Sequence, residues 1–188
     1  MKRLITLLIC ALSCTGAFAQ NPLMEVKSGS LDIFKDSVSI NVVIEDYNAL
    51  IYGRNQYDKE YFTAQSQQTY LEFCDDLMRG HESFISYYNI EKGRLNSVMV
   101  KSNDAPYTLQ VDVSLMNVGN SARAIIGLSH KSGGAMIYGT MKLIDNASGE
   151  VKCEIAFNGI KGMRSPIFRG RAISVYRYLA YALIGTIR

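Results

Sequence analysis

The side chains best suited to acid–base chemistry in this sequence are two histidines, His81 and His130, the only imidazoles in the chain. A serine or cysteine hydrolase needs such a base within hydrogen-bond reach of its nucleophile. The sequence contains no Gly-x-Ser-x-Gly motif, so neither histidine lies near a nucleophile elbow. A small exported hydrolase or transferase is therefore the alternative function and not the favoured one.

Adjacent carboxylates at Asp75 and Asp76, with Glu72 one turn earlier, are a second candidate for acid–base or cation chemistry. Neighbouring residues on a helix point about 100° apart, so a solvated helical face is the commoner outcome. The glycine-rich stretch at 133–139 lacks the spacing of phosphate-binding loops, and a hairpin turn explains it.

A basic, glycine-containing segment over 159–171 precedes the expected C-terminal helix. Unpaired N–H groups at a helix start, together with local positive charge, bind anions such as phosphate or carboxylate. The alternative is a connection whose cations only keep it soluble. The residues assigned to this predicted anion site are Lys161, Arg164, Ser165, Arg169 and Arg171.

The chain has 12 tyrosines and no tryptophan, and four tyrosines cluster around one expected loop. Exposed tyrosine gives a rigid, amphipathic contact area of the kind that partner and glycan surfaces use. The alternative is that these rings cap the edge of the core with their hydroxyls in water. The four are Tyr47, Tyr52, Tyr57 and Tyr61.

The charge of the chain gives no reason to expect a nucleic-acid partner. The formal charge is +3, and Lys2 and Arg3 supply two of the positive charges. Subtracting these two from the 20 basic residues and setting the rest against 17 acidic residues leaves about +1. A hydrophobic content of 48% excludes a disordered or collagen-like chain.

Residues 1–19 have the three parts of a signal peptide: a basic start, an apolar core and an A-x-A motif that ends at Ala19. Cleavage after Ala19 predicts a periplasmic or secreted chain of residues 20–188. The alternative is a lipoprotein acylated at Cys14, but Ala11 stands where such signals carry a leucine-like residue. No later run reaches the ~18 uncharged apolar residues that a membrane span needs.

Two cysteines, Cys74 and Cys153, remain after the signal peptide. An exported compartment permits a disulfide between them, and a pair of buried core thiols is the equal alternative. With the two histidines they match no zinc spacing, so the sequence predicts no metal site and no cofactor.

Hydrophobic periodicity predicts an α+β chain. Helical spacing from Tyr57 ends at Gly80, a candidate C-terminal stop, and a shorter helix over 81–91 is closed by Gly93. Ser165 as N-cap and Pro166 at the first position begin a helix that runs to residue 187. Alternating apolar residues predict strands over 37–46, 107–115, 122–129, 135–144 and 151–160.

Short turns rich in Gly, Asn and Ser join the last four of these strands, as β-hairpins require. They predict an antiparallel meander sheet of about five or six strands. Two main helices cover one face, and the other face is polar. Neither a linker nor an internal repeat divides residues 20–188, so we expect one α+β domain.

The stretches 107–113, 139–145 and 149–151 resemble exported envelope domains of Gram-negative bacteria, of the Bacteroidetes type and the curli-secretion accessory lipoprotein-like group. In that group a strand ends in an Asp before a small turn, and a late helix closes the domain. The resemblance implies a mostly non-enzymatic protein, so no catalytic residue carries over. This chain departs from the group in its lipidation signal.

Together these observations predict a non-catalytic binding or assembly module of the periplasm or cell envelope, acting through a tyrosine-rich or basic surface. An envelope protein or a glycan is the expected partner, and a second copy of the chain, bound through a sheet edge, is a further candidate. An enzyme should instead have a deep polar pocket near one of the histidines.

Overall fold

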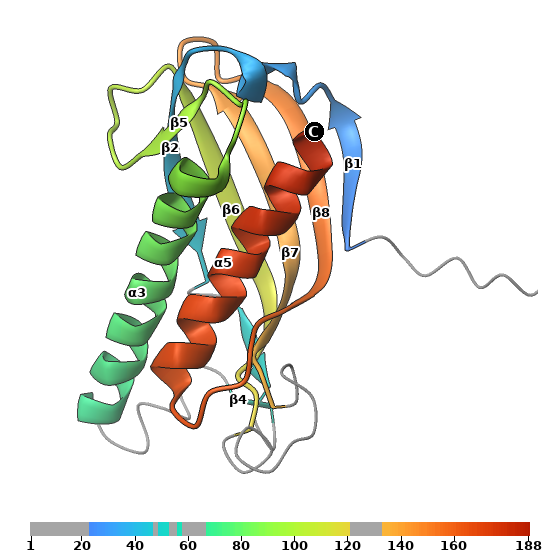
Figure 1. Cartoon of the computed structure of the whole chain (residues 1–188). Helices are drawn as coiled ribbons and strands as arrows, with labels where there is room; N and C mark the ends of the chain where they lie inside the picture. The colour runs from blue at the N-terminus through green and yellow to red at the C-terminus, as the bar shows by residue number, and fades with distance from the viewer. Residues whose placement is uncertain (1–22, 47–48, 53–55, 58–66, 121–132) are drawn as a thin grey trace, which may run out of the picture.

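The computed structural model of the chain describes residues 23–46, 49–52, 56–57, 67–120 and 133–188 (Figure 1). The segment expected to be a signal peptide and the strand expected over 122–129 lie outside these residues. The elements are β1 (Met24–Gly29), the 3₁₀ helix η1 (Asp32–Lys35), β2 (Ser39–Glu45), β3 (Leu50–Tyr52), β4 (Gln56–Tyr57), α3 (Gln67–Glu91), β5 (Val98–Val100), β6 (Tyr107–Asn117), β7 (Met136–Asp145), β8 (Val151–Lys161) and α5 (Phe168–Ile187).

The predicted hairpin strands form the centre of a sheet with the order β1-β8-β7-β6-β2-β5. Strands β7 and β8 pair antiparallel, as the turn between them predicts. Strand β6 also pairs antiparallel with β7, although the predicted meander places the strand expected over 122–129 between these two. Leu109, Val111 and Val113 of β6 are buried, whereas Asp112 and Ser114 between them are exposed. The α+β class and the β7–β8 hairpin are therefore confirmed, whereas the predicted order of the meander strands is wrong at β6.

The prediction of a purely antiparallel sheet is wrong, because β2 pairs in parallel with both β6 and β5. Strand β3 also pairs in parallel with β6. The 25-residue helix α3 lies between β2 and β5 in the sequence. At 1.5 Å per residue such a helix spans roughly 37 Å, which returns the chain to the end of the sheet where β2 began. The next strand then enters in the same direction as β2, as in a β-α-β crossover.

Helix α3 runs without a break through Gly80, so the predicted stop there and the predicted division into two helices are both wrong. Gly80 is buried, and a Cβ added to it would lie 2.4 Å from Cδ2 of Tyr176 in α5. This glycine therefore allows two helices to approach closely instead of ending one. The expected closure at Gly93 is confirmed: the helix ends at Glu91, and Gly93 has a φ of +62°.

Helix α5 begins at Phe168, not at the predicted Ser165–Pro166 start. Its N-cap residue is Ile167, which makes no side-chain capping hydrogen bond. Arg171, from the first turn, donates hydrogen bonds to the carbonyl oxygens of Ser165 and Pro166. These carbonyls are thereby held outside the helix, which delays its start.

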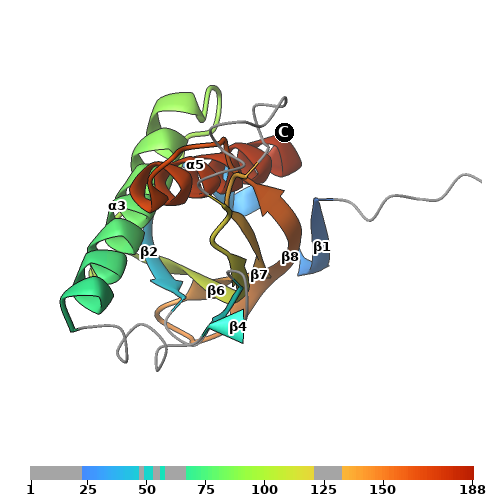
Figure 2. The ribbon, with the colours of Figure 1, turned by 90° about the horizontal axis from the view of Figure 1, so that it is seen from below.

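Both main helices pack on one face of the sheet, as predicted (Figures 1 and 2). Side chains from the inner face of the sheet and from both helices form one hydrophobic core, with Phe84, Phe157 and Tyr176 fully buried. Ser83 of α3 also donates a 3.0 Å hydrogen bond to the carbonyl of Ile173 in α5. Among the described helices, none is both long enough and apolar enough to cross a membrane.

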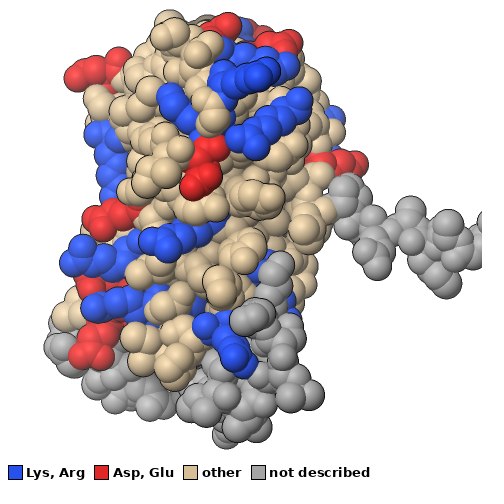
Figure 3. Space-filling model, in the orientation of Figure 1, with Lys and Arg blue, Asp and Glu red and all other residues tan. Residues whose placement is uncertain are grey.

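The outer face of the helical layer is the surface seen in Figure 3, where Lys and Arg side chains gather over both helices with a few carboxylates among them. Helix α5 contributes two exposed arginines, Arg169 and Arg177, and no acidic residue. The opposite, uncovered face of the sheet carries polar residues such as Asp112, Ser114 and Lys142, all of them exposed. The two faces of the molecule therefore differ in chemistry.

Candidate functional site

A buried carboxylate joins three elements at the end of β2. Asp46 Oδ2 accepts a 2.6 Å hydrogen bond from the hydroxyl of Tyr176 in α5 and lies 2.7 Å from Nε2 of His81 in α3. The Asp46 side chain is 9% exposed and that of His81 is 17% exposed. Burial, followed by the charge of Asp46 and its hydrogen bond, raises the pKa of Tyr176 well above its ordinary value. The hydroxyl therefore stays protonated and donates.

This Asp46–His81–Tyr176 cluster has the residue types of acid–base chemistry, and its side chains are buried or nearly so. Tyr176 is fully buried. Among the described residues, Asp46 is the only hydrogen-bond partner of His81, so no Ser or Cys nucleophile contacts the imidazole. The arrangement instead ties β2 to both helices. The sequence analysis considered His81 but missed Asp46 and Tyr176, whose pairing spans 130 residues.

Arg171, one of the five residues of the predicted anion site, is only 5% exposed. Its Nε donates to the carbonyl of Val118 at 2.7 Å, and its Nη1 donates to the carbonyls of Ser165 at 2.7 Å and Pro166 at 3.2 Å. Burial lowers the pKa of its guanidinium. Its guanidinium also lies 5.8 Å from the centre of the Phe168 ring. Arg171 thus fastens the β8–α5 connection to the end of β6.

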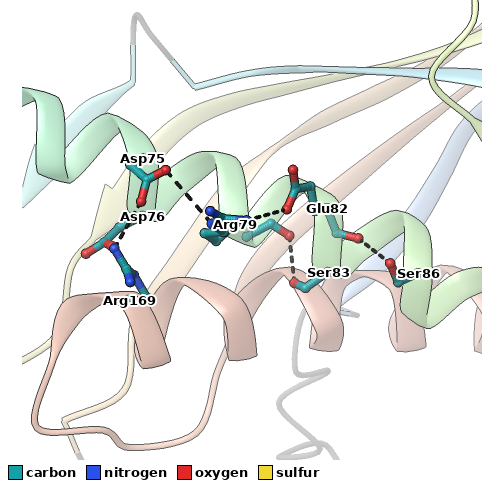
Figure 4. Close-up of polar contacts among 8 residues, drawn as sticks. Asp75, Asp76, Arg79, Glu82, Ser83, Ser86 and Arg169 are labelled. Atoms are coloured by element: carbon teal, nitrogen blue, oxygen red, sulfur yellow. Dashed lines mark hydrogen bonds and ion pairs between the residues drawn. The ribbon is translucent and has the colours of Figure 1, made fainter.

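Arg169 also contacts groups of the chain itself. Its Nε lies 2.6 Å from Asp76 Oδ1 and its Nη2 lies 3.0 Å from Asp75 Oδ2, both on α3 (Figure 4). The hydrogen bond to Asp76 is the main cause that raises the pKa of Arg169. The two carboxylates considered for acid–base chemistry are therefore ion-pair partners that link α3 to the start of α5.

Lys161 lies apart from these arginines, in a polar hollow of about 310 Å³ at one end of β6–β8. Asn117, Gly133, Gly134 and other residues of the two adjoining loops line this hollow with it. A Cβ at Gly134 would lie 2.3 Å from the carbonyl oxygen of Gly162, so this glycine serves a close approach of two backbones. Arg171, Arg169 and Lys161 of the basic segment thus lie in three different places in the structure. Anion binding by this segment stays a prediction.

Replacing Arg171 with methionine is expected to lower the free energy of unfolding by about 2–3 kcal/mol, because a buried guanidinium and its hydrogen bonds to three carbonyl oxygens are lost. The matched control is Arg169→Met, whose exposed ion pairs should contribute less than about 1 kcal/mol. Urea unfolding followed by circular dichroism measures both values. Equal losses in the two variants would contradict the structural role of Arg171.

The cysteines are not joined in this structure, and both are free thiols. Cys153 lies in the core on β8, where burial raises the pKa of its thiol. Cys74 is half-buried on α3. This arrangement corresponds to the core-thiol alternative for Cys153. No group of three or more potential metal ligands lies together in the described parts of the chain.

The predicted tyrosine surface lies largely outside the described residues. Tyr47 and Tyr61 are not described, and for Tyr52 and Tyr57 only their places in β3 and β4 are described. A different tyrosine surface lies on the outer side of the helical layer. It is a hollow of about 430 Å³, here called the helical groove, lined by Tyr87, Met163, Ser174, Arg177, Tyr178 and Tyr181.

Helix α5 supplies four of the groove residues at i, i+3, i+4 and i+7, which places them on one face. Tyr181 is 61% exposed. Among the described residues, neither the guanidinium of Arg177 nor the hydroxyls of Tyr87 and Tyr181 have a hydrogen-bond or ion-pair partner. Ser174 is bonded internally, to the carbonyls of Arg171 and Met163. The groove therefore presents one cation and two phenols to solvent.

The sequence did not predict this surface, because the stronger signal in the same helix is the apolar stripe that marks its buried face. A second stripe, of Arg177, Tyr178 and Tyr181, lies beside the buried one and could have been read from the same spacing. Tyr87 comes from the other helix, at a point that only helix packing brings near. None of the residues that line this groove is acidic.

No protein-family profile and no curated protein matches this chain. A solved structure of a PelC dodecamer from Paraburkholderia phytofirmans is similar at a TM-score of 0.39 and 12% identity, covering 84% of this chain and 96% of that one. A variant of the same protein gives a TM-score of 0.39 and 13% identity, covering 85% and 97%. Similarity at this level carries no conclusion about the function of the present chain.

Proposed function

We propose that this protein is a non-catalytic binding module of the bacterial cell envelope and that it binds its partner through the helical groove. The observation that carries the proposal is the exposed pair Arg177 and Tyr181 with the half-buried Tyr87, none of which has a hydrogen-bond or ion-pair partner among the described residues. Tyrosine and arginine dominate the binding energy of protein interfaces. Export by the signal peptide of residues 1–19 is part of the proposal.

The buried and paired polar side chains elsewhere in the molecule hold its helices and strands in place. Asp46, His81 and Tyr176 contact one another beneath the surface, and Arg171 contacts backbone carbonyls. Arg169 is engaged by two carboxylates of α3. These contacts hold the two helices at a set spacing, and the groove lies between those helices.

The test is an affinity capture with full-length, C-terminally tagged protein expressed in a Gram-negative host. Captured envelope proteins are compared among the wild type, Arg177→Ala/Tyr181→Ala and Thr140→Ala/Lys142→Ala. The last variant changes the opposite, polar face of the sheet and serves as the control. A specific partner retained by the wild type and the control but lost from the groove variant supports the proposal. Equal capture by all three proteins would overturn the groove as the binding surface.

A further inference from the structure

We propose that the occupant of the helical groove is a peptide segment of a partner protein that presents an Asp or Glu carboxylate to Arg177. The inference rests on the proposed function and adds the chemistry of the ligand. Three features of the groove carry it: its residue types, the charge of Arg177, and the exposure of Tyr181.

The residue types favour a protein partner over a glycan. Three tyrosines, one methionine and one arginine make up five of the six lining residues. Aromatic residues, Met and Arg are the types enriched at protein interfaces, whereas Lys, Glu, Asp and Ser are depleted there. The flexible thioether of Met163, which is exposed, can adapt to an apolar side chain of the partner.

The charge of Arg177 favours a carboxylate from the partner. A peptide lying in the groove removes water from this guanidinium, and an uncompensated buried charge is strongly unfavourable. The groove itself lacks an acidic residue, and α5 carries none along its length. A carboxylate that receives two parallel N–H hydrogen bonds from the guanidinium compensates the charge with good geometry.

The rings on either side give the rest of the contact. Tyr181 is 61% exposed and stands one helical turn after Arg177, so its ring can cover an apolar side chain next to the carboxylate. Across the groove, the hydroxyl of Tyr87 is available to a peptide carbonyl or N–H group. We therefore expect a motif with an acidic residue beside an aromatic or large aliphatic one.

The test is an mRNA-display selection of random dodecapeptides on the immobilised full chain, run in parallel on Arg177→Gln, Tyr181→Ala and the control Lys142→Gln. Lys142 carries a charge on the opposite face, so the control removes one positive charge without touching the groove.

Wild type and control should enrich peptides that contain Asp or Glu beside an apolar residue. For the best peptide, Arg177→Gln should weaken binding about 10- to 100-fold by fluorescence anisotropy. Arg177→Lys should weaken it less, because it keeps the charge but loses the bidentate geometry.

The outcomes separate the ligand chemistry from the proposed function. Acid enrichment that disappears with Arg177→Gln supports the inference. Enriched peptides without acidic residues, whose binding depends on Tyr181, would overturn the carboxylate and leave the groove as a binding surface. If no peptide is enriched above the Tyr181→Ala background, the proposal of a peptide ligand is overturned. A groove that binds a glycan would give this result. The capture experiment then decides separately whether the groove binds a partner at all.

Discussion

Replacing Asp46 with alanine is expected to lower the free energy of unfolding by about 3–5 kcal/mol, because it removes one member of a buried, hydrogen-bonded set. The fully buried hydroxyl of Tyr176 would lose its acceptor, and His81 would lose its only described hydrogen-bond partner. A buried polar group left without a partner retains its full desolvation penalty. Urea unfolding monitored by tyrosine fluorescence measures the loss.

Two further variants make this prediction specific. Glu45→Ala changes the adjacent, exposed carboxylate and should alter stability by less than about 0.5 kcal/mol. Tyr176→Phe deletes the donor but keeps the ring, so it should cost about 1–2 kcal/mol. A loss for Asp46→Ala no larger than that for Glu45→Ala would show that the buried set does not stabilise the fold.

Gly80→Ala is expected to destabilise the protein by about 2 kcal/mol, although alanine is the better helix former. The added Cβ would lie 2.4 Å from Cδ2 of Tyr176 and 3.3 Å from the carbonyl oxygen of Ala172. Asp46 holds the Tyr176 ring by its hydroxyl, so the ring cannot turn aside, and overpacking of this kind costs about 1–3 kcal/mol. This cost exceeds the gain in helix propensity of about 1 kcal/mol.

The matched control is Gly185→Ala, at a helical glycine of α5 where an added Cβ meets nothing within 4 Å. This substitution should stabilise the protein by about 0.5–1 kcal/mol, the ordinary difference between glycine and alanine in a helix. Thermal unfolding of the two variants should therefore shift in opposite directions. A stabilising effect of alanine at both positions would mean that α3 and α5 do not need glycine for their contact at residue 80.

Both predictions bear on the groove because they concern how closely the two helices pack. Tyr87 belongs to α3, whereas Arg177 and Tyr181 belong to α5. Their separation therefore depends on the contact at Gly80 and on the hydrogen bonds of Asp46. A variant that moves the helices apart should weaken partner binding without changing any residue that contacts the partner.

Some elements could be predicted because their signals are local. Strand β6 alternates buried and exposed residues along most of its length, and the turns that join β7 to β8 carry the residues that hairpins need. The apolar stripe of α5 predicted its buried face, including Tyr176, Leu179 and Leu183. In each case the deciding interactions lie within a few residues along the chain.

Other features could not be predicted because the deciding partner is distant in sequence. In the sequence Gly80 resembles a helix stop, but in the structure it lies against the Tyr176 ring, where α3 and α5 contact each other. The basic segment has the character of an anion site, but Arg169 pairs with Asp75, 94 residues away. Arg171 likewise bonds a carbonyl 53 residues away, at Val118. Charge pattern alone does not show which cations are already compensated within the fold.

By itself, the sequence determined the α+β class, the β7–β8 hairpin and the buried faces of the elements, since side-chain periodicity records which face of a helix or strand is apolar. Only the tertiary structure decided the parallel pairing of β2 with β6 and the place of each charged group. A strand has the same period whichever direction its neighbour runs. A guanidinium has the same charge whether it contacts a carbonyl, as Arg171 does, or solvent, as Arg177 does. The candidate surface therefore emerged from packing, which left Arg177 without an ion-pair partner among the described residues and beside the exposed Tyr181.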